Sequence, residues 1–275
     1  MKKWYAVIGD PVAQSMSPAM HDAWFVDNAI DASYIPVHVK AEELQKAVAS
    51  LKKLGCSGWN VTVPHKSTII PFLDQLEPSA KLMDAVNTVH VLPDGTLVGS
   101  NTDGLGFVRS LEEMFGEQCK GKKVLIIGAG GAARGIAYAL HSMGYGPISF
   151  TNRTVEKAEQ LASELLDSTL LSITEAQSTL AEFGLIVQTT TVGMNFAQLG
   201  MPLDPKNVVE GTVVADIIYN PLETEFLAEA RKKGAQTMNG VGMFVHQGAL
   251  AFETWTGFRP NTEKMIQKIT TTLGG

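Results

Sequence analysis

The sequence predicts an α/β protein made of two domains. Strand-like and helix-like segments alternate along the chain, which is typical of α/β architecture. The length of 275 residues suits roughly two domains of ordinary size. An apolar run at residues 123–127 leads directly into a glycine-rich turn, as at the start of a nucleotide-binding domain. We therefore expect two α/β domains, one of which carries a nucleotide site.

Composition and charge exclude several classes of function. The net charge of −6 and the pI near 5.5 leave no broad basic face, so we expect neither a nucleic-acid partner nor a membrane partner. No apolar run is long enough to span a bilayer. Two isolated cysteines, Cys56 and Cys119, favour a cytoplasmic location, because a reducing compartment keeps thiols free. The six histidines show no ligand spacing, so no metal is expected.

The first elements of the chain predict a sheet covered by helices. A short apolar strand over Trp4–Gly9 precedes a helix that begins at Ser17 and Pro18. Serine at the N-cap followed by proline at the first helical position is a strong start signal. A second strand, Tyr34–Val39, leads to a helix over Ala41–Leu54, whose apolar residues recur at helical spacing.

A third strand and a hairpin complete this first sheet. The strand Trp59–Val63 ends at Pro64, which cannot continue a central strand. The runs Val86–Leu92 and Thr96–Gly99 flank Pro-Asp-Gly, a hairpin signal, so we expect the sheet to carry an antiparallel edge. The helix Asp103–Phe115 then crosses into the second domain.

The second half of the chain repeats the alternation of strands and helices. Its predicted strands are Lys123–Ile127, Ile148–Asn152, Leu185–Thr190 and Val213–Ile218. A long helix over Gly240–Trp255 and a shorter one from about Asn261 follow. Strands that alternate with helices in this way predict a mostly parallel sheet.

The glycine-rich turn after residue 127 has the form GxGxxA, a variant of the dinucleotide fingerprint of Rossmann-type domains. Gly128 allows the tight turn, Gly130 lets the backbone approach a pyrophosphate, and Ala133 allows close packing of helix on strand. The pyrophosphate would lie at the helix N-terminus, where free N–H groups favour an anion. A purely structural turn is the alternative. The expected cofactor contacts of the turn are Gly128, Ala129, Gly130, Gly131 and Ala132.

The strand that follows indicates which dinucleotide binds. An NAD site places Asp or Glu about 20 residues after the glycines, against the ribose hydroxyls. This chain has Asn152, Arg153 and Thr154 there, with Lys157 one turn later. A guanidinium binds a phosphate bidentately, so we expect NADP. A solvated arginine on a loop is the alternative.

Polar side chains in the first domain form candidate substrate contacts. Ser15 and Ser17 place two hydroxyls at a helix start, which suits a small carboxylate, although Ser17 could serve only as the N-cap. Alternation puts Asn60 and Thr62 on one face of the third strand. Lys66 follows the end of that strand, where α/β active sites lie, although a lone lysine is equally often a solvated surface group.

A third polar cluster comprises residues 85–88 and 100–104, where Asn and Asp residues lie near strand ends. Such residues often only close turns.

Eight sequence stretches follow one another in an order that is typical of one enzyme family. They are residues 9–18, 58–66, 85–88, 101–104, 128–133, 152–154, 216–221 and 240–257. In these stretches the chain resembles the shikimate dehydrogenases along nearly its whole length. The resemblance implies reversible NADPH-dependent reduction of 3-dehydroshikimate to shikimate, in the chorismate and aromatic amino-acid biosynthesis pathway.

The same resemblance implies roles for individual residues. Lys66 and Asp103 look like the catalytic pair, and Ser15 and Ser17 look like the groups that bind the substrate carboxylate. The further substrate contacts that it implies are Thr62, Asn87, Tyr219 and Gln247. The backbone near Ile217 and Gly240 look like neighbours of the nicotinamide. Two positions depart from the usual pattern, Gln188 where the family has Asn and Thr191 where it has Ser.

The motifs divide the chain into two functional domains. We expect a shikimate-binding domain at residues 1–102, with residues 241–275 returning to it, and a Rossmann-like NADP-binding domain at residues 103–240. The active site is expected in the cleft between them. A quinate or related cyclitol dehydrogenase is the nearest alternative. A non-catalytic NADP-sensing protein is a further one, but a sensor would need neither Lys66 nor Asp103. The sequence leaves both a monomer and a homodimer open.

Overall fold

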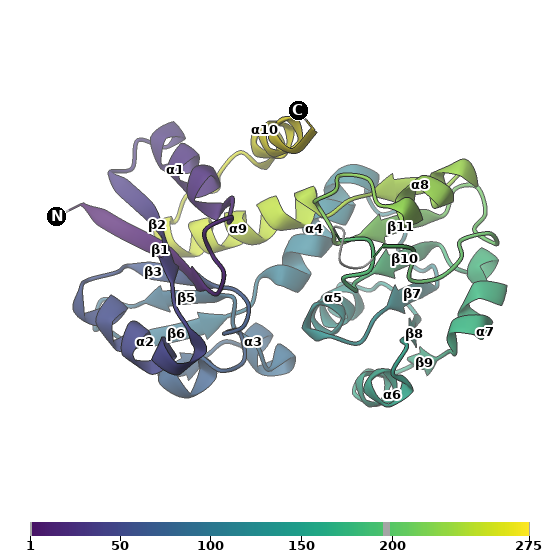
Figure 1. Ribbon diagram of the computed structural model, residues 1–275, viewed down its shortest axis with the longest axis horizontal. Coiled ribbons are helices and arrows are strands. Elements are labelled where there is room, and N and C mark those ends of the chain that lie inside the picture. Colours follow the sequence, from purple (N-terminus) through teal and green to yellow (C-terminus); the bar gives the residue numbers. More distant parts are fainter. Residues whose placement is uncertain (1, 195–198, 275) are drawn as a thin grey trace. The chain divides into compact units, whose positions relative to one another are not determined.

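The computed structural model describes residues 2–194 and 199–274, which form two compact units (Figure 1). Unit 1 comprises Met1–Asp103 and Gln247–Met265, and unit 2 comprises Gly104–His246 and Ile266–Gly275. The segment expected to return to the first domain, residues 241–275, is therefore divided, and only residues 247–265 group with unit 1. Residues 1 and 275, the ends of the expected domain ranges, lie outside the described residues.

Unit 1 contains a mixed six-stranded sheet with the strand order β2-β1-β3-β5-β6-β4. Its strands are β1 (Lys3–Gly9), β2 (Ala32–His38), β3 (Gly58–Val61), β4 (Gln75–Leu76), β5 (Thr88–Val91) and β6 (Leu97–Ser100). Only β5 is antiparallel to its neighbours, β3 and β6. The antiparallel strand therefore lies inside the sheet, and the expectation that it forms the edge is wrong. The edge is β4, which pairs with β6 and is too short to show a sequence pattern.

Helices cover both faces of the unit 1 sheet (Figure 1). On one face, α2 (Leu44–Lys53) packs Leu44, Val48 and Leu51 against apolar side chains of β1 and β3. On the other face, aromatic side chains pack against Tyr5 and Tyr34. They come from α1 (Ser17–Asp27) and from the unit 1 part of α9 (Val241–Thr256), and they are His21, Phe25 and Trp255. A short helix, α3 (Pro78–Met83), and a 3-10 turn, η2 (Ile70–Phe72), complete the unit.

Two helix starts differ from the sequence expectation. Ser17 is the first residue of α1 and Pro18 the second, while Met16 is the N-cap, so the assignment of Ser17 as N-cap is wrong. Proline lacks an N–H and fits anywhere in the first turn, which left the boundary uncertain by one residue. The helix expected from Ala41 begins as a 3-10 turn, η1 (Ala41–Glu43), before α2.

Unit 2 contains a parallel six-stranded sheet with the strand order β12-β11-β10-β7-β8-β9. Its strands are β7 (Val124–Ile127), β8 (Ile148–Thr151), β9 (Thr169–Leu170), β10 (Leu185–Gln188), β11 (Val213–Asp216) and β12 (Gln236–Met238). Numbered within the unit, this is the order 3-2-1-4-5-6 of Rossmann folds. The expected α/β class, with one Rossmann-type sheet and one mixed sheet, is confirmed.

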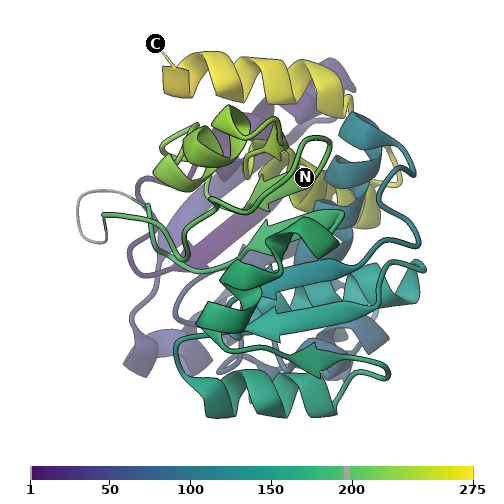
Figure 2. The same ribbon diagram turned by 90° about the vertical axis from the view of Figure 1, so that its right-hand side faces the viewer.

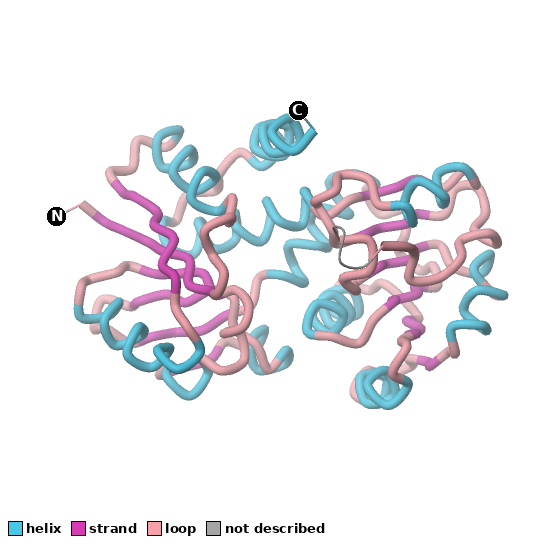
Figure 3. The backbone as a smooth tube through the Cα atoms, viewed as in Figure 1, coloured by secondary structure: helices cyan, strands magenta, loops and turns pink. Residues whose placement is uncertain are grey.

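Helices lie on both faces of the parallel sheet (Figure 2). One face is covered by α4 (Asp103–Phe115), α5 (Gly131–Ser142) and α6 (Val155–Ser163), and the other by α7 (Ile173–Ser178), η3 (Leu180–Glu182) and α8 (Glu225–Lys232). The last helix is α10 (Thr262–Gly274). Figure 3 distinguishes the strands, in magenta, from the helices around them. Among the described residues, no helix combines the length and apolar character needed to cross a membrane.

Candidate active site

The polar clusters of unit 1 meet on the side of its sheet where β3 and β6 end and β5 begins. Asn60 near the end of β3 pairs with Thr88 at the start of β5, and Thr88 pairs with Ser100 at the end of β6. The carboxyl ends of β3 and β6 and the amino end of β5 therefore share an edge. The segments that follow or precede these strands there are residues 62–66, 85–87 and 101–103.

Lys66 and Asp103 form an ion pair at this edge. The distance from Lys66 Nζ to Asp103 Oδ2 is 2.6 Å. The side chain of Lys66 is 32% exposed and that of Asp103 is 16% exposed, so the pair is shielded but reachable from solvent. An ammonium held this way combines a positive charge with transferable protons, the two properties that a general acid needs.

The backbone around Lys66 is fixed on both sides. Neighbouring His65 is buried, and its Nε2 lies 2.6 Å from the carbonyl oxygen of Val39. The carbonyl of Lys66 accepts a hydrogen bond of 2.7 Å from the N–H of Val86. These bonds tie the loop after β3 to the end of β2 and to the segment before β5. The backbone position from which the Lys66 side chain extends is therefore fixed.

Asp103 is held by hydrogen bonds to both its backbone and its carboxylate. Its N–H donates to Asn101 Oδ1 at 3.0 Å, and its Oδ1 accepts from Asn87 Nδ2 at 2.8 Å. It is also the first residue of α4, where a negative charge interacts favourably with the helix dipole. Each carboxylate oxygen therefore has a defined partner, Asn87 on one side and Lys66 on the other.

The hydroxyl groups expected to bind substrate lie on loops after β1 and β3. Ser15 Oγ accepts from the N–H of Ser17 at 3.3 Å, so Ser15 satisfies the free N–H group at the start of α1. Thr62 follows β3 and touches the end of β1, because a Cβ added to Gly9 would lie 2.4 Å from Thr62 Cγ2. Glycine at position 9 is required by this approach.

The last two expected substrate contacts lie in different units. Gln247 belongs to unit 1, where its carbonyl oxygen accepts from Thr102 Oγ1 at 3.0 Å. Tyr219 belongs to unit 2, where its ring packs against Phe244 with the centroids 5.3 Å apart. Burial raises the pKa of Tyr219, so its phenol stays neutral and can donate a hydrogen bond.

In unit 2, the glycine turn joins β7 to α5 as the fingerprint predicts. Gly128 has φ +119°, and a Cβ there would lie 2.4 Å from Thr189 Oγ1, so only glycine fits. At Gly130 and Gly131 an added Cβ would meet nothing within 4 Å. The N-cap of α5 is Gly130, and no side chain of the described residues forms a capping hydrogen bond there. An open helix N-terminus bordered by bare backbone fits a pyrophosphate. Of the remaining motif residues, Ala129 and Ala132 are partly buried.

The end of β8 presents a basic, exposed segment. Asn152 Nδ2 donates to the carbonyl of Thr154 at 2.8 Å, which closes the turn before α6. Arg153 and Lys157 are exposed. The arrangement fits a phosphate group attached to a ribose, because a guanidinium and an ammonium lie where NAD enzymes place a carboxylate.

The end of β11 contains a buried acid whose role the sequence did not reveal. Asp216 accepts hydrogen bonds from the N–H of Ile218 at 3.0 Å and from Thr224 Oγ1 at 2.8 Å. Burial raises its pKa to about 6, although both hydrogen bonds act in the opposite direction. These bonds fix the backbone around Ile217. Gly240 packs against the Ile217 carbonyl so closely that a Cβ on Gly240 would lie 2.0 Å from its oxygen.

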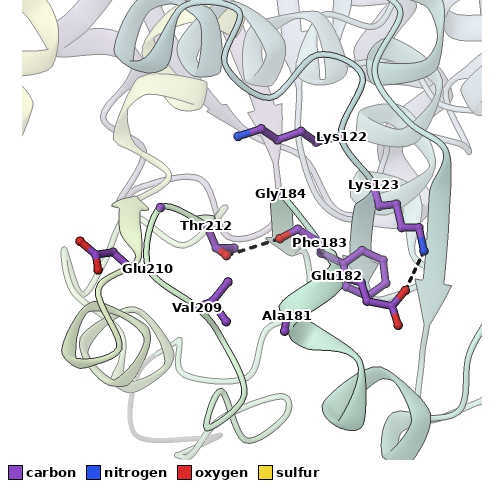
Figure 4. Close-up of a pocket in the computed structure, with 10 residues that line it drawn as sticks. Lys122, Lys123, Ala181, Glu182, Phe183, Gly184, Val209, Glu210 and Thr212 are labelled. Atoms are coloured by element: carbon purple, nitrogen blue, oxygen red, sulfur yellow. Dashed lines mark hydrogen bonds and ion pairs between the residues drawn. The ribbon is translucent and has the colours of Figure 1, made fainter.

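A surface pocket of unit 2 lies away from these motifs. Its volume is about 300 Å³, and its lining includes residues that precede β7, β10 and β11 (Figure 4). In it, Lys123 pairs with Glu182 at 2.6 Å, and Thr212 donates to the carbonyl of Phe183. The glycine turn is at the opposite, carboxyl-terminal edge of the sheet. Among the described residues, no group of three or more His, Cys, Asp or Glu side chains could hold a metal ion.

Family models match the chain in three segments. Residues 7–89 match the shikimate dehydrogenase substrate binding domain, residues 110–201 match shikimate / quinate 5-dehydrogenase, and residues 240–270 match the shikimate 5'-dehydrogenase C-terminal domain. The first segment contains Lys66, and the second contains the glycine turn.

Full-length relatives extend this match. The chain is 54% identical to a shikimate dehydrogenase (NADP(+)) of Lysinibacillus sphaericus, over all of both chains. Its fold is similar to the crystal structure of shikimate 5-dehydrogenase from Thermus thermophilus in complex with NADP(H) and shikimate, with TM-score 0.90, 34% identity, and 98% and 100% of the two chains covered. It is also similar to quinate dehydrogenase from Corynebacterium glutamicum in complex with NAD, with TM-score 0.90, 28% identity, and 98% and 99% covered. The chain therefore belongs to the shikimate dehydrogenase family.

Proposed function

We propose that this protein is an NADP-dependent oxidoreductase that interconverts 3-dehydroshikimate and shikimate. The observation that carries the proposal is the Lys66–Asp103 ion pair, held at 2.6 Å on the substrate-binding unit of a chain in the shikimate dehydrogenase family. The pair supplies both a proton donor and a carboxylate that orients it, which reduction of a carbonyl needs. The 54% identity to a shikimate dehydrogenase (NADP(+)) over the whole chain favours an enzyme over a sensor.

The chemistry divides between cofactor and protein. Bound NADPH supplies the hydride that reduces the ring carbonyl. Lys66 donates the proton that the carbonyl oxygen needs, and its charge stabilises the negative charge that grows on that oxygen. Asp103 orients the ammonium through Oδ2, while Asn87 holds Oδ1. In the reverse direction the same lysine, once deprotonated, accepts the proton of the substrate hydroxyl.

Further side chains are proposed to bind the two ligands. The substrate carboxylate lies against Ser15 and Ser17, and other substrate contacts are Thr62, Asn87, Gln247 and Tyr219. The pyrophosphate lies against the glycine turn, and the 2′-phosphate lies against Arg153 with Asn152, Thr154 and Lys157. Gly240 and the backbone of Ile217 border the nicotinamide. Unit 1 is thus the substrate domain and unit 2 the cofactor domain.

The proposal extends to the cellular setting. The reaction belongs to aromatic amino-acid biosynthesis and is expected to take place in the cytoplasm, where the two buried cysteines, which form no disulfide, would remain reduced. The substrates are small molecules, so neither nucleic acid nor membrane is a partner, and the protein acts as a monomer or a homodimer.

Quinate is the second candidate substrate, because the chain is also similar to a quinate dehydrogenase. The test follows cofactor reduction with shikimate and with quinate, each with NADP⁺ and with NAD⁺. We expect the highest kcat/KM for shikimate with NADP⁺. A preference for quinate would assign the second activity, and no reduction with either substrate would refute an enzyme of this kind.

A further inference from the structure

A chain of hydrogen bonds in unit 1 leads from a buried tyrosine to the Asp103 carboxylate. Tyr34 Oη donates to Asn60 Oδ1 at 2.6 Å, and Asn60 Nδ2 donates to Thr88 Oγ1 at 3.1 Å. Thr88 Oγ1 donates to Asn87 Oδ1 at 2.8 Å, and Asn87 Nδ2 donates to Asp103 Oδ1 at 2.8 Å. Each residue therefore orients the next one along the chain.

The direction of these bonds is set by the number of protons available. Burial raises the pKa of Tyr34 well above its ordinary value, so its phenol keeps its single proton. Asn60 Nδ2 also donates to the backbone carbonyl of Asn87 at 3.1 Å, so the amide oxygen of Asn60 is left to accept the proton of Tyr34. The oxygen of Asn60 then faces Tyr34, and its nitrogen faces Thr88. The Thr88 hydroxyl accepts that N–H with a lone pair. Its own single proton is therefore free to be donated, and it goes to Asn87 Oδ1.

Two donors, the Thr88 hydroxyl and the backbone N–H of Thr102, determine how the Asn87 amide is turned. Its oxygen accepts from Thr88 Oγ1 and from the N–H of Thr102 at 2.9 Å. Its nitrogen donates to Asp103 Oδ1 and also to Thr102 Oγ1 at 2.9 Å. A flipped amide would set an oxygen against the carboxylate, which would push Asp103 away from the position that holds Lys66.

The far end of the chain is fixed by packing. The Tyr34 ring stacks on His21 with the centroids 4.3 Å apart and the planes 3° from parallel. His21 is fully buried, and neither of its ring nitrogens has a hydrogen-bond partner among the residues that the structure describes. Burial lowers the pKa of His21 to about 3, so it packs as a neutral aromatic ring. Removal of the Tyr34 hydroxyl alone would therefore leave this stack in place.

We propose that Thr88 is a positioning residue for the reaction, because its hydroxyl is one of the two donors that fix the Asn87 amide and through it the Asp103 carboxylate. Thr88 is completely buried, so it cannot touch the substrate itself. The proposal rests on the proposed function, in which Asp103 orients the proton donor Lys66. It adds a second layer of the site that no ligand contacts.

Isosteric substitution of Thr88 tests the proposal. Thr88→Val removes the hydroxyl and keeps the shape, whereas Thr88→Ser keeps the hydroxyl. Loss of one buried hydrogen bond that leaves its partners unsatisfied should lower kcat by about tenfold. The KM for NADP⁺ should not change, and Thr88→Ser should restore most of kcat. Tyr34→Phe, which removes the first donor of the chain, should lower kcat in the same way by a smaller factor.

A coupling measurement separates positioning from general structural damage. Thr88→Val should lower kcat in the parent protein but not in the Asp103→Ala background, since the group through which it acts is then absent. The matched control is Thr212→Val, a buried threonine directly before β11, whose hydroxyl donates to the carbonyl of Phe183 in unit 2. It should leave kcat unchanged.

Two results would overturn the inference. One is an unchanged kcat for Thr88→Val while Asp103→Ala is impaired. The other is the same loss from Thr88→Val with and without Asp103. If Asp103→Ala itself kept full turnover, the proposed function of the ion pair would fail instead, so the two failures are distinguishable.

Discussion

At the scale of single residues, the site brings charges of opposite sign into fixed positions. Lys66 and Asp103 are partly shielded from water, where a Coulomb interaction is stronger than on an open surface. Each has backbone and side-chain partners that fix its direction. An ammonium with a fixed position loses little entropy on meeting the substrate oxygen, which is the condition for efficient proton transfer.

Arg153 is expected to select the cofactor. Arg153→Ala should raise the KM for NADP⁺ by roughly ten- to a hundredfold, since a hydrogen bond to a charged group contributes about 1.5–3 kcal/mol. The KM for NAD⁺ should barely change, because NAD⁺ has no 2′-phosphate. Steady-state kinetics with both cofactors provide the measurement, and Arg259→Ala in unit 1 is the control. Equal losses for NADP⁺ and NAD⁺ would exclude this role for Arg153.

Asp216 should make stability depend on pH. Its pKa rises from 3.8 to about 6 on folding, so the folded state binds the proton more tightly than the unfolded state. The free energy of unfolding contributed by this group is therefore highest below pH 4 and falls as the pH rises through 6. The full loss is on the order of 3 kcal/mol, at about 1.4 kcal/mol per pH unit.

Urea unfolding of the parent and of Asp216→Asn between pH 4 and pH 7.5 measures this effect. Asparagine cannot ionise, so the stability of the variant relative to the parent should increase with pH. A constant difference between the two proteins across this range would show that Asp216 has the same pKa in the folded and unfolded states.

At the scale of elements, the site is built from strand ends and the turns that follow them. In unit 2, the turn after β7 brings bare backbone to the start of α5, and the end of β11 meets Gly240. In both places a glycine is required, because a Cβ at Gly128 would collide with Thr189 and a Cβ at Gly240 would collide with the carbonyl of Ile217. Gly128 and Gly240 are therefore constrained by the fold, whereas an added Cβ at Gly130 or Gly131 would meet no protein atom within 4 Å.

Two glycine substitutions should separate folding from cofactor binding. Gly128→Ala places a Cβ against Thr189 at φ +119° and should lower the free energy of unfolding by about 1–3 kcal/mol. Gly130→Ala meets no atom and should leave stability unchanged, but it should raise the KM for NADP⁺ because its Cβ would point at the pyrophosphate. Thermal unfolding and steady-state kinetics report the two quantities. A stable Gly130→Ala with unchanged KM would contradict the placement of the pyrophosphate.

Much of this architecture could be predicted from the sequence, because long apolar runs and turn residues determine strands and their ends. The range Asp103–Phe115 is the helix α4 as predicted, and the glycine turn has the expected geometry. The two-residue strand β4 carries no periodicity, and its omission misplaced the sheet edge. Thr88 gave no signal of its role, since its function depends on hydrogen bonds to residues distant in the chain.

At the scale of the whole molecule, three helices belong to both units. Asp103 ends the first part of unit 1 and begins α4, which continues in unit 2. The helix α9 runs from unit 2 into unit 1, and α10 runs back from unit 1 into unit 2. The chain thus divides its motifs between two sheets, the ion pair with one and the glycine turn with the other. In the proposed function each motif binds its own ligand, so substrate binding, cofactor binding and turnover can be measured separately.

The most direct test is the comparison of binding and turnover in Lys66→Ala, with Lys123→Ala, an exposed lysine of unit 2, as the control. Loss of a general acid lowers the rate by about a hundred- to ten-thousandfold. We expect kcat to fall by that factor, while calorimetry shows that shikimate and NADP⁺ still bind with nearly the parent affinities. Near-normal kcat with loss of shikimate binding alone would contradict this mechanism, because Lys66 would then anchor the substrate and the proton would come from another group or from water.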